Sequence, residues 1–168
     1  TAEISRMMWN DCYKISNIEK YPLPWDKRDI DTAMDSWITH EFDTQWEQQD
    51  WKLSLCRAGH IPGAGMLNID TPSKNILFTG DFDSRDSPLT SGAKPIKTDV
   101  LFIEGTYGGK DHANQNEELT RFIDNIIRVT DKGGTVLIPA FANGRTQDML
   151  MRLHQNCPEL DVHVDGMG

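Results

Sequence analysis

The spacing of apolar residues divides the chain into a strand-rich middle and a helix-rich end. Alternation of apolar with polar or small residues predicts a half-buried strand over residues 51–56, and apolar runs predict strands over 66–69 and 76–79. Turn-forming residues separate the last two, so an antiparallel hairpin is expected. Upstream we expect a helix over 2–14, a proline-containing loop over 20–25, and a short helix capped by Asp29 or Asp31.

The second half of the chain alternates strand-like and helix-like patterns. Continuous apolar runs over 100–103 and 135–138 predict strands buried on both faces. Helices are expected over 116–130, ending at two glycines, and over 144–154, and a short strand over 162–164. This β-α-β-α-β order favours a parallel sheet with right-handed crossovers, so we expect an α/β fold.

Composition limits the classes of function. The 168 residues carry 17 Lys+Arg and 26 Asp+Glu, a formal charge of −9, which opposes RNA binding by a broad cationic face. The charge does not oppose metal chemistry, because a bound dication reverses the local field. Three distant cysteines without a CxxC pattern indicate free thiols and a cytoplasmic protein. No run approaches the ~18 apolar residues of a membrane span. Because the chain starts at Thr1, we interpret it as a segment of a longer protein.

Three polar residues stand beside glycines or at the ends of apolar runs, namely His60, Asp81 and Glu104. Imidazole is the commonest zinc ligand in proteins, and a carboxylate that follows a strand can bridge two metal ions ~3.5–4 Å apart. Glu104 could be a ligand, an acid or base, or the group that orients a histidine. Each residue also has a structural alternative: a core histidine, a turn-forming aspartate and a glutamate that supports a turn.

Arg145 begins a predicted helix after a predicted buried strand. Backbone amides at a helix N-terminus attract anions, and arginine binds phosphate well. The alternative is that Arg145 braces its loop through a carboxylate such as Asp148. Two other motifs are weaker. The segment around Lys110 lacks the spacing of a phosphate-binding loop, and His163 has no second histidine nearby with which to bind a metal.

Four segments in order, AGHIPGAG, LFTGDF, IEGTYG and IPAFANGRTQDML, resemble the β-CASP branch of the metallo-β-lactamase fold. That branch includes ribonuclease J and the endonuclease subunit of the cleavage and polyadenylation specificity factor, and archaeal members without KH domains look most similar. The resemblance covers roughly residues 11–168. It implies part of an αββα sandwich over 1–108, followed by the start of a parallel α/β β-CASP domain over 109–168.

The resemblance also implies roles. His60 matches a metal-ligand histidine, and Asp81 matches the aspartate that bridges two zinc ions. Glu104 matches the acidic residue that opens the β-CASP insertion and works near the scissile phosphate, so Asp81 and Glu104 are the expected catalytic residues. Arg145 would lie in the lobe that clamps RNA. The implied function is that of an RNase, a zinc-dependent hydrolase of RNA phosphodiester bonds in 3'-end processing or decay, with endo- or exonuclease action and two Zn²⁺ in the complete protein.

One family signature does not occur in this sequence, the HxHxDH cluster that supplies most of the zinc ligands. The family order places that cluster before Thr1 and further histidines after Gly168, so we expect the segment to be inactive alone. A catalytically inactive scaffold subunit of an RNA-processing complex is the main alternative. A small-molecule hydrolase of the same core is disfavoured by the GRTQDML segment. RNA is the expected partner, and no membrane is expected. A homodimer is one possible oligomeric state.

Overall fold

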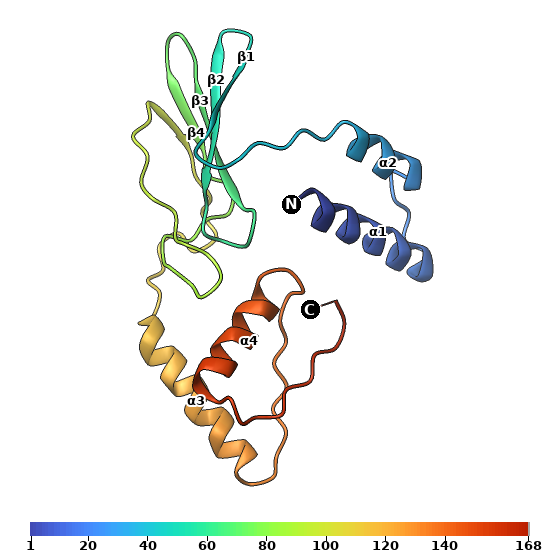
Figure 1. The fold of residues 1–168 in the computed structure, drawn as a ribbon, viewed down its shortest axis with the longest axis vertical. Coiled ribbons are helices and arrows are strands. Elements are labelled where there is room, and N and C mark those ends of the chain that lie inside the picture. The colour runs from blue at the N-terminus through green and yellow to red at the C-terminus, as the bar shows by residue number, and fades with distance from the viewer. Residues whose placement is uncertain (168) are drawn as a thin grey trace. The chain divides into compact units, whose positions relative to one another are not determined.

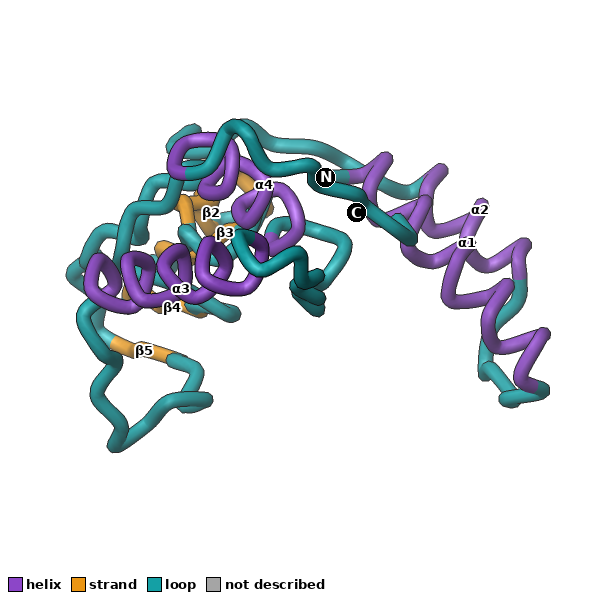
Figure 2. Tube along the Cα trace, turned by 90° about the horizontal axis from the view of Figure 1, so that it is seen from below, coloured by secondary structure: helices purple, strands orange, loops and turns teal. Residues whose placement is uncertain are grey.

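The computed structural model describes residues 1–167, which form two compact units, one of Thr1–Thr44 and one that begins at Gln45. The first unit is a pair of helices, α1 (Ala2–Glu19) and α2 (Lys27–Asp35), which lie side by side (Figures 1 and 2). An ion pair of 2.8 Å joins Arg6 to Asp31, and the rings of Trp9 and Trp37 lie 5.8 Å apart. None of the helices among residues 1–167 is long and apolar enough to cross a membrane.

The residue that caps α2 differs from both predicted candidates. Asp26 is the cap, because its Oδ1 accepts hydrogen bonds from the N–H groups of Arg28 and Asp29 at 2.6 and 3.4 Å. The bond in the other direction is also present, since Oδ2 of Asp29, inside the helix, accepts a hydrogen bond from the Asp26 N–H at 2.7 Å. Asp31 pairs with α1 instead. The helix thus starts earlier than the apolar spacing indicates, at a reciprocal capping box.

The second unit contains a five-stranded mixed sheet whose strands lie in sequence order. Figure 1 labels β1 to β4, and Figure 2 labels β5. The strands are β1 (Gln45–Gln48), β2 (Trp51–Arg57), β3 (Gly65–Asp70), β4 (Asn75–Phe78) and β5 (Val100–Phe102). Strands β1 to β4 pair antiparallel, so the predicted hairpin is confirmed as β3–β4, with Ile69 opposite Ile76. Strand β5 pairs parallel to β4 at the sheet edge. The short and largely polar β1 was not predicted.

The two faces of the sheet differ in what covers them. On one face, Met66 and Leu77 join Ala58 and Ala93 in a buried core, with Phe82 and Ile96 from the loop after β4 packed against it. The other face we call the apolar face. By strand register it carries nine apolar side chains, none of them fully buried: Trp46, Leu53, Leu55, Leu67, Ile69, Ile76, Phe78, Val100 and Phe102.

Helices α3 (Gln115–Thr130) and α4 (Arg145–Asn156) follow β5 and pack together around a second core (Figure 2). That core consists of Ile123, Ile126, Leu153 and Cys157. Helix α3 begins where predicted, because the Asn114 side chain accepts hydrogen bonds from two N–H groups of its first turn. An α/β architecture is therefore present, with a sheet core and a separate helical core within one unit.

The predicted parallel sheet after residue 100 is wrong. Strand β5 is a sheet edge and is not buried on both faces, since Leu101 and Phe102 are 48% and 53% exposed. Residues 135–138 and 162–164 are not strands in the described chain. Val136 and Ile138 do pack on the helical core, while Leu137 between them is 89% exposed. The prediction of a strand buried on both faces is therefore wrong, since only alternate side chains pack. A strand also needs a neighbour, and residues 1–167 supply none there.

Candidate functional site

His60 lies in a tight loop directly after β2, and that loop is clamped by backbone contacts. A Cβ on Gly59, whose φ is +71°, would stand 2.4 Å from the carbonyl oxygen of Asp83 and 2.9 Å from the Cα of Gly92. The Asp83 N–H donates to the Ala58 carbonyl at 2.9 Å, which fastens the two loops together. Only glycine allows this approach, so the backbone fixes where His60 stands.

Asp81 follows β4 and lies beside His60. The Nε2 of His60 is 3.9 Å from the Oδ2 of Asp81, and the side chains are 34% and 71% exposed. Zinc–nitrogen and zinc–oxygen bonds together span about 4.2 Å, so one ion can contact both atoms. These two predicted ligands are brought together, and both remain accessible to a ligand.

Glu104 follows β5, the parallel neighbour of β4. It therefore stands beyond the carboxyl ends of these two strands, as Asp81 does. Its Oε1 accepts from the Phe82 N–H at 3.3 Å and its Oε2 from the Thr106 N–H at 3.1 Å. The pKa of Glu104 lies below its ordinary value, mainly through the Thr106 side chain, then through the two backbone N–H groups and the nearby imidazole of His60. Glu104 is therefore an ionised carboxylate held next to the residue that follows Asp81.

The residues fit part of a metal site. Within residues 1–167 no group of three or more His, Cys, Asp or Glu side chains is arranged to hold an ion. His60 and Asp81 thus supply two of the roughly four ligands that tetrahedral zinc needs. The donor types fit zinc, and the remaining positions are not filled by the described chain.

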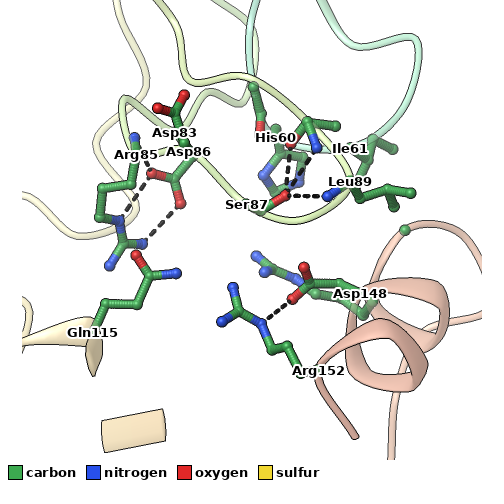
Figure 3. A pocket seen from close by; sticks show the side chains of 14 residues that line it. His60, Ile61, Asp83, Arg85, Asp86, Ser87, Leu89, Gln115, Asp148 and Arg152 are labelled. Atoms are coloured by element: carbon green, nitrogen blue, oxygen red, sulfur yellow. Dashed lines mark hydrogen bonds and ion pairs between the residues drawn. The ribbon is translucent and has the colours of Figure 1, made fainter. Parts of the chain in front are cut away.

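A pocket of about 60 Å³ lies next to His60 (Figure 3). That volume exceeds the roughly 10–15 Å³ needed by one water molecule. Four segments line it: the His60 loop, the loop after β4, the start of α3, and α4 as far as Arg152. Arg85 enters from the loop after β4 and donates from Nε and Nη2 to the two oxygens of Asp83, at 2.9 and 2.7 Å. This pairing lowers the pKa of Asp83 and raises that of Arg85.

Arg145 is the first residue of α4, is exposed and lines the pocket. Asp148 pairs with Arg152, whose Nε lies 2.9 Å from Oδ2, and not with Arg145. In the described chain Arg145 makes no ion pair and no side-chain hydrogen bond, so the structure does not support the bracing alternative. Gly144 lets α4 start against the His60 loop, since a Cβ there would stand 2.7 Å from Cγ2 of Ile61.

Sequence reasoning missed Arg85 and Arg152, and it named Asp148 only as a possible partner of Arg145. The four-residue spacing of Asp148 and Arg152 on a predicted helix was a usable signal for their pairing. The structure adds no support for the two weaker motifs, around Lys110 and His163. Lys110 lies in a series of tight turns several residues before α3. His163 contacts Asp161 on an exposed segment.

The described residues thus define an α/β protein. A histidine and two carboxylates follow the carboxyl ends of three of its strands, beside a pocket rich in arginine. No model of a known protein family matches the chain. It is 32% identical over 176 residues to Probable RNase MJ4 of Methanocaldococcus jannaschii. It is 35% identical over 158 residues to cleavage and polyadenylation specificity factor subunit 3 of Dictyostelium discoideum, and 31% over 170 residues to RNase aCSPSF2 of Saccharolobus solfataricus.

These alignments cover 99%, 92% and 99% of this chain, but 41%, 20% and 34% of the relatives. The chain therefore spans less than half the length of the curated relatives it matches. Relatives named as RNases and as a cleavage and polyadenylation specificity factor subunit thus support the β-CASP family over 92–99% of this chain.

Proposed function

We propose that the complete protein is a zinc-dependent ribonuclease that hydrolyses phosphodiester bonds during RNA 3'-end processing or decay. Relatives that are named as ribonucleases support the reaction class. The observation that carries the proposal is the distance of 3.9 Å between His60 Nε2 and Asp81 Oδ2, with Glu104 at the carboxyl end of the neighbouring strand. RNA is the proposed partner, and a homodimer in the cytoplasm is the proposed setting.

Each residue has a defined task in this proposal. His60 and Asp81 would hold zinc, and the exposed carboxylate of Asp81 has two oxygens with which to bridge two ions. When bound, zinc acts as a Lewis acid toward water and phosphate oxygens. Glu104 is ionised at neutral pH and serves as a hydrogen-bond or proton acceptor, or as the group that orients a histidine. Arg145 would contact a backbone phosphate of the RNA.

The apolar face supports the finer part of the fold proposal, an αββα sandwich of the metallo-β-lactamase type. Phe78 and Phe102 stack at 4.4 Å between ring centroids yet remain 39% and 53% exposed. A second sheet packed on this face would bury such side chains, as the inner layers of a sandwich do. The proposed boundary between residues 1–108 and 109–168 falls in the exposed loop between β5 and α3.

Asp81→Asn in the complete protein tests the function. We expect RNA cleavage to be lost while the fold and melting temperature are retained, because the amide keeps the shape but is a poor bridging ligand. Asp70→Asn is the matched control, since Asp70 also ends a strand of the sheet and is exposed. Near-normal cleavage by the Asp81 variant would contradict the proposed role. A complete protein that binds RNA but neither cleaves it nor retains zinc would be the inactive scaffold.

A further inference from the structure

The Arg152 side chain combines burial with unused donors. It is only 13% exposed, and it lines the pocket beside His60 (Figure 3). Its Nε donates to Asp148 Oδ2 at 2.9 Å. Its two terminal nitrogens have no hydrogen-bond partner among residues 1–167. A guanidinium is a planar fork, so fixing it at Nε leaves the two terminal groups pre-oriented for a planar or tetrahedral anion.

Asp148 is buried, with 7% of its surface exposed, although one of its carboxylate oxygens receives no hydrogen bond from the described chain. Oδ2 receives the bond from Arg152, while Oδ1 has no hydrogen-bond partner in the described chain. Asp148 lies in the first turn of α4, where a carboxylate favours the helix dipole. Its Oδ2 also fixes the orientation of the Arg152 guanidinium through the bond to Nε.

The other carboxylates of the pocket are occupied by protein donors. Both oxygens of Asp83 accept from Arg85, and Asp86 Oδ1 accepts from the Gly92 N–H at 2.8 Å. The pocket is thus formally balanced in charge, and its groups without a protein partner in the described chain include the terminal guanidinium N–H groups of Arg152 as well as Asp148 Oδ1. The start of α4 adds less, because the Thr146 N–H already donates to the Phe141 carbonyl. Recognition here rests on side chains rather than on the helix terminus.

We propose that this pocket binds a backbone phosphate of the RNA other than the one that is cleaved, with Arg152 as the donor and Asp148 as its positioning residue. The inference rests on the proposed ribonuclease function. His60 belongs both to the pocket lining and to the histidine–carboxylate pair, so a strand held at that pair passes the pocket. Arg145 stands exposed on the same lining, whereas the Arg152 side chain is only 13% exposed.

The test uses the complete protein and a set of RNAs that each carry one uncharged methylphosphonate, placed at the cleaved linkage or within three linkages on either side. For the unsubstituted protein, one flanking methylphosphonate should raise KM about tenfold with kcat little changed, since a single charge-assisted contact is removed from binding. In Arg152→Gln, KM for natural RNA should already be about tenfold higher, and the same methylphosphonate should have no further effect.

Asp148→Asn tests the positioning role. We expect it to raise KM in the natural background but not in the Arg152→Gln background, because it acts only through Arg152. Arg121→Gln is the matched control. It breaks an ion pair of α3 between Arg121 and Glu118, both outside this pocket. Its KM and methylphosphonate pattern should match those of the unsubstituted protein.

The outcomes separate this inference from the function on which it rests. If Arg152→Gln lowers the melting temperature but leaves KM and the methylphosphonate pattern intact, the ion pair is only structural and the inference is wrong. If the complete protein does not cleave RNA, the ribonuclease proposal fails, and the same RNAs are then compared by affinity. A flanking position whose effect disappears in Arg152→Gln still supports the pocket, and the absence of such a position overturns it.

Discussion

Replacing Gly144 with alanine should weaken the contact between α4 and the loop that carries His60. The residue has φ +85° and ψ −57°, close to the rare and strained values of a γ-turn. Its new Cβ would also stand 2.7 Å from Cγ2 and 3.1 Å from Cβ of Ile61. Ile61 is β-branched and stiff, so it cannot move aside as the end of a flexible side chain would.

The two costs can be estimated separately. A left-handed backbone costs a residue with a Cβ about 1–2 kcal/mol. Overpacking by one methyl group costs about 1–3 kcal/mol. The sum is about 2–5 kcal/mol, and a domain of this size loses roughly 2–4 °C of melting temperature per kcal/mol. Gly144→Ala should therefore lower the melting temperature of the complete protein by roughly 4–20 °C.

Gly133→Ala supplies the matched control. Gly133 has φ +73° but nothing within 4 Å of its would-be Cβ, so it reports the backbone cost alone, roughly 2–8 °C. The double variant Gly144→Ala with Ile61→Ala should recover the overpacking part. Thermal unfolding by circular dichroism measures all three variants. Equal losses for Gly144→Ala and Gly133→Ala, with no recovery in the double variant, would refute the packing of α4 on the His60 loop.

Three further predictions concern the chemistry. Residues 1–168 alone should not retain stoichiometric zinc after dialysis, because His60 and Asp81 are two ligands of about four; metal analysis that finds tight zinc would contradict this. Glu104→Gln in the complete protein should lower the cleavage rate ~10²–10⁴-fold at unchanged zinc content. Because the pKa of Glu104 lies below its ordinary value of about 4.3, the loss should be constant from about pH 6 to 8, and loss of zinc instead would make Glu104 a ligand. Arg145→Ala should reduce the salt dependence of RNA binding by about one phosphate contact without changing the melting temperature, and an unchanged salt slope would rule out direct contact.

Sequence patterns predicted elements well where local spacing decides them. The β3–β4 hairpin follows from two apolar runs separated by turn-forming residues, and α3 follows from a 3.6-residue apolar stripe. Both patterns depend on nearby residues only. The cap of α2 was misplaced because a capping box requires two side chains to bond reciprocally, and several aspartates compete for that role. Residues 135–138 show the other limit. Their continuous apolar run predicted a strand buried on both faces, but only Val136 and Ile138 pack on the helical core, and strand formation depends on a distant neighbour.

The candidate site was predicted in part. His60, Asp81 and Glu104 could be selected because each follows an apolar run or stands among glycines, and the ends of β2, β4 and β5 carry them to one region. The partners of Glu104 could not be predicted, because the Phe82 N–H reaches it only through the parallel pairing of β4 and β5. The sequence left open whether Arg145 pairs with Asp148, and the structure pairs Asp148 with Arg152, which lies equally within reach along the helix.

The apolar face affects how this chain behaves as a solute. Chains with a formal charge of −9 repel one another over a Debye length of about 30 Å at 0.01 M salt, but over only about 3 Å at 1 M. Added salt therefore allows the apolar faces of two chains to meet, while it weakens contacts between arginine and phosphate. A binding curve recorded across salt with residues 1–168 would carry two opposing effects. Light scattering at each salt concentration separates self-association from a change in RNA affinity.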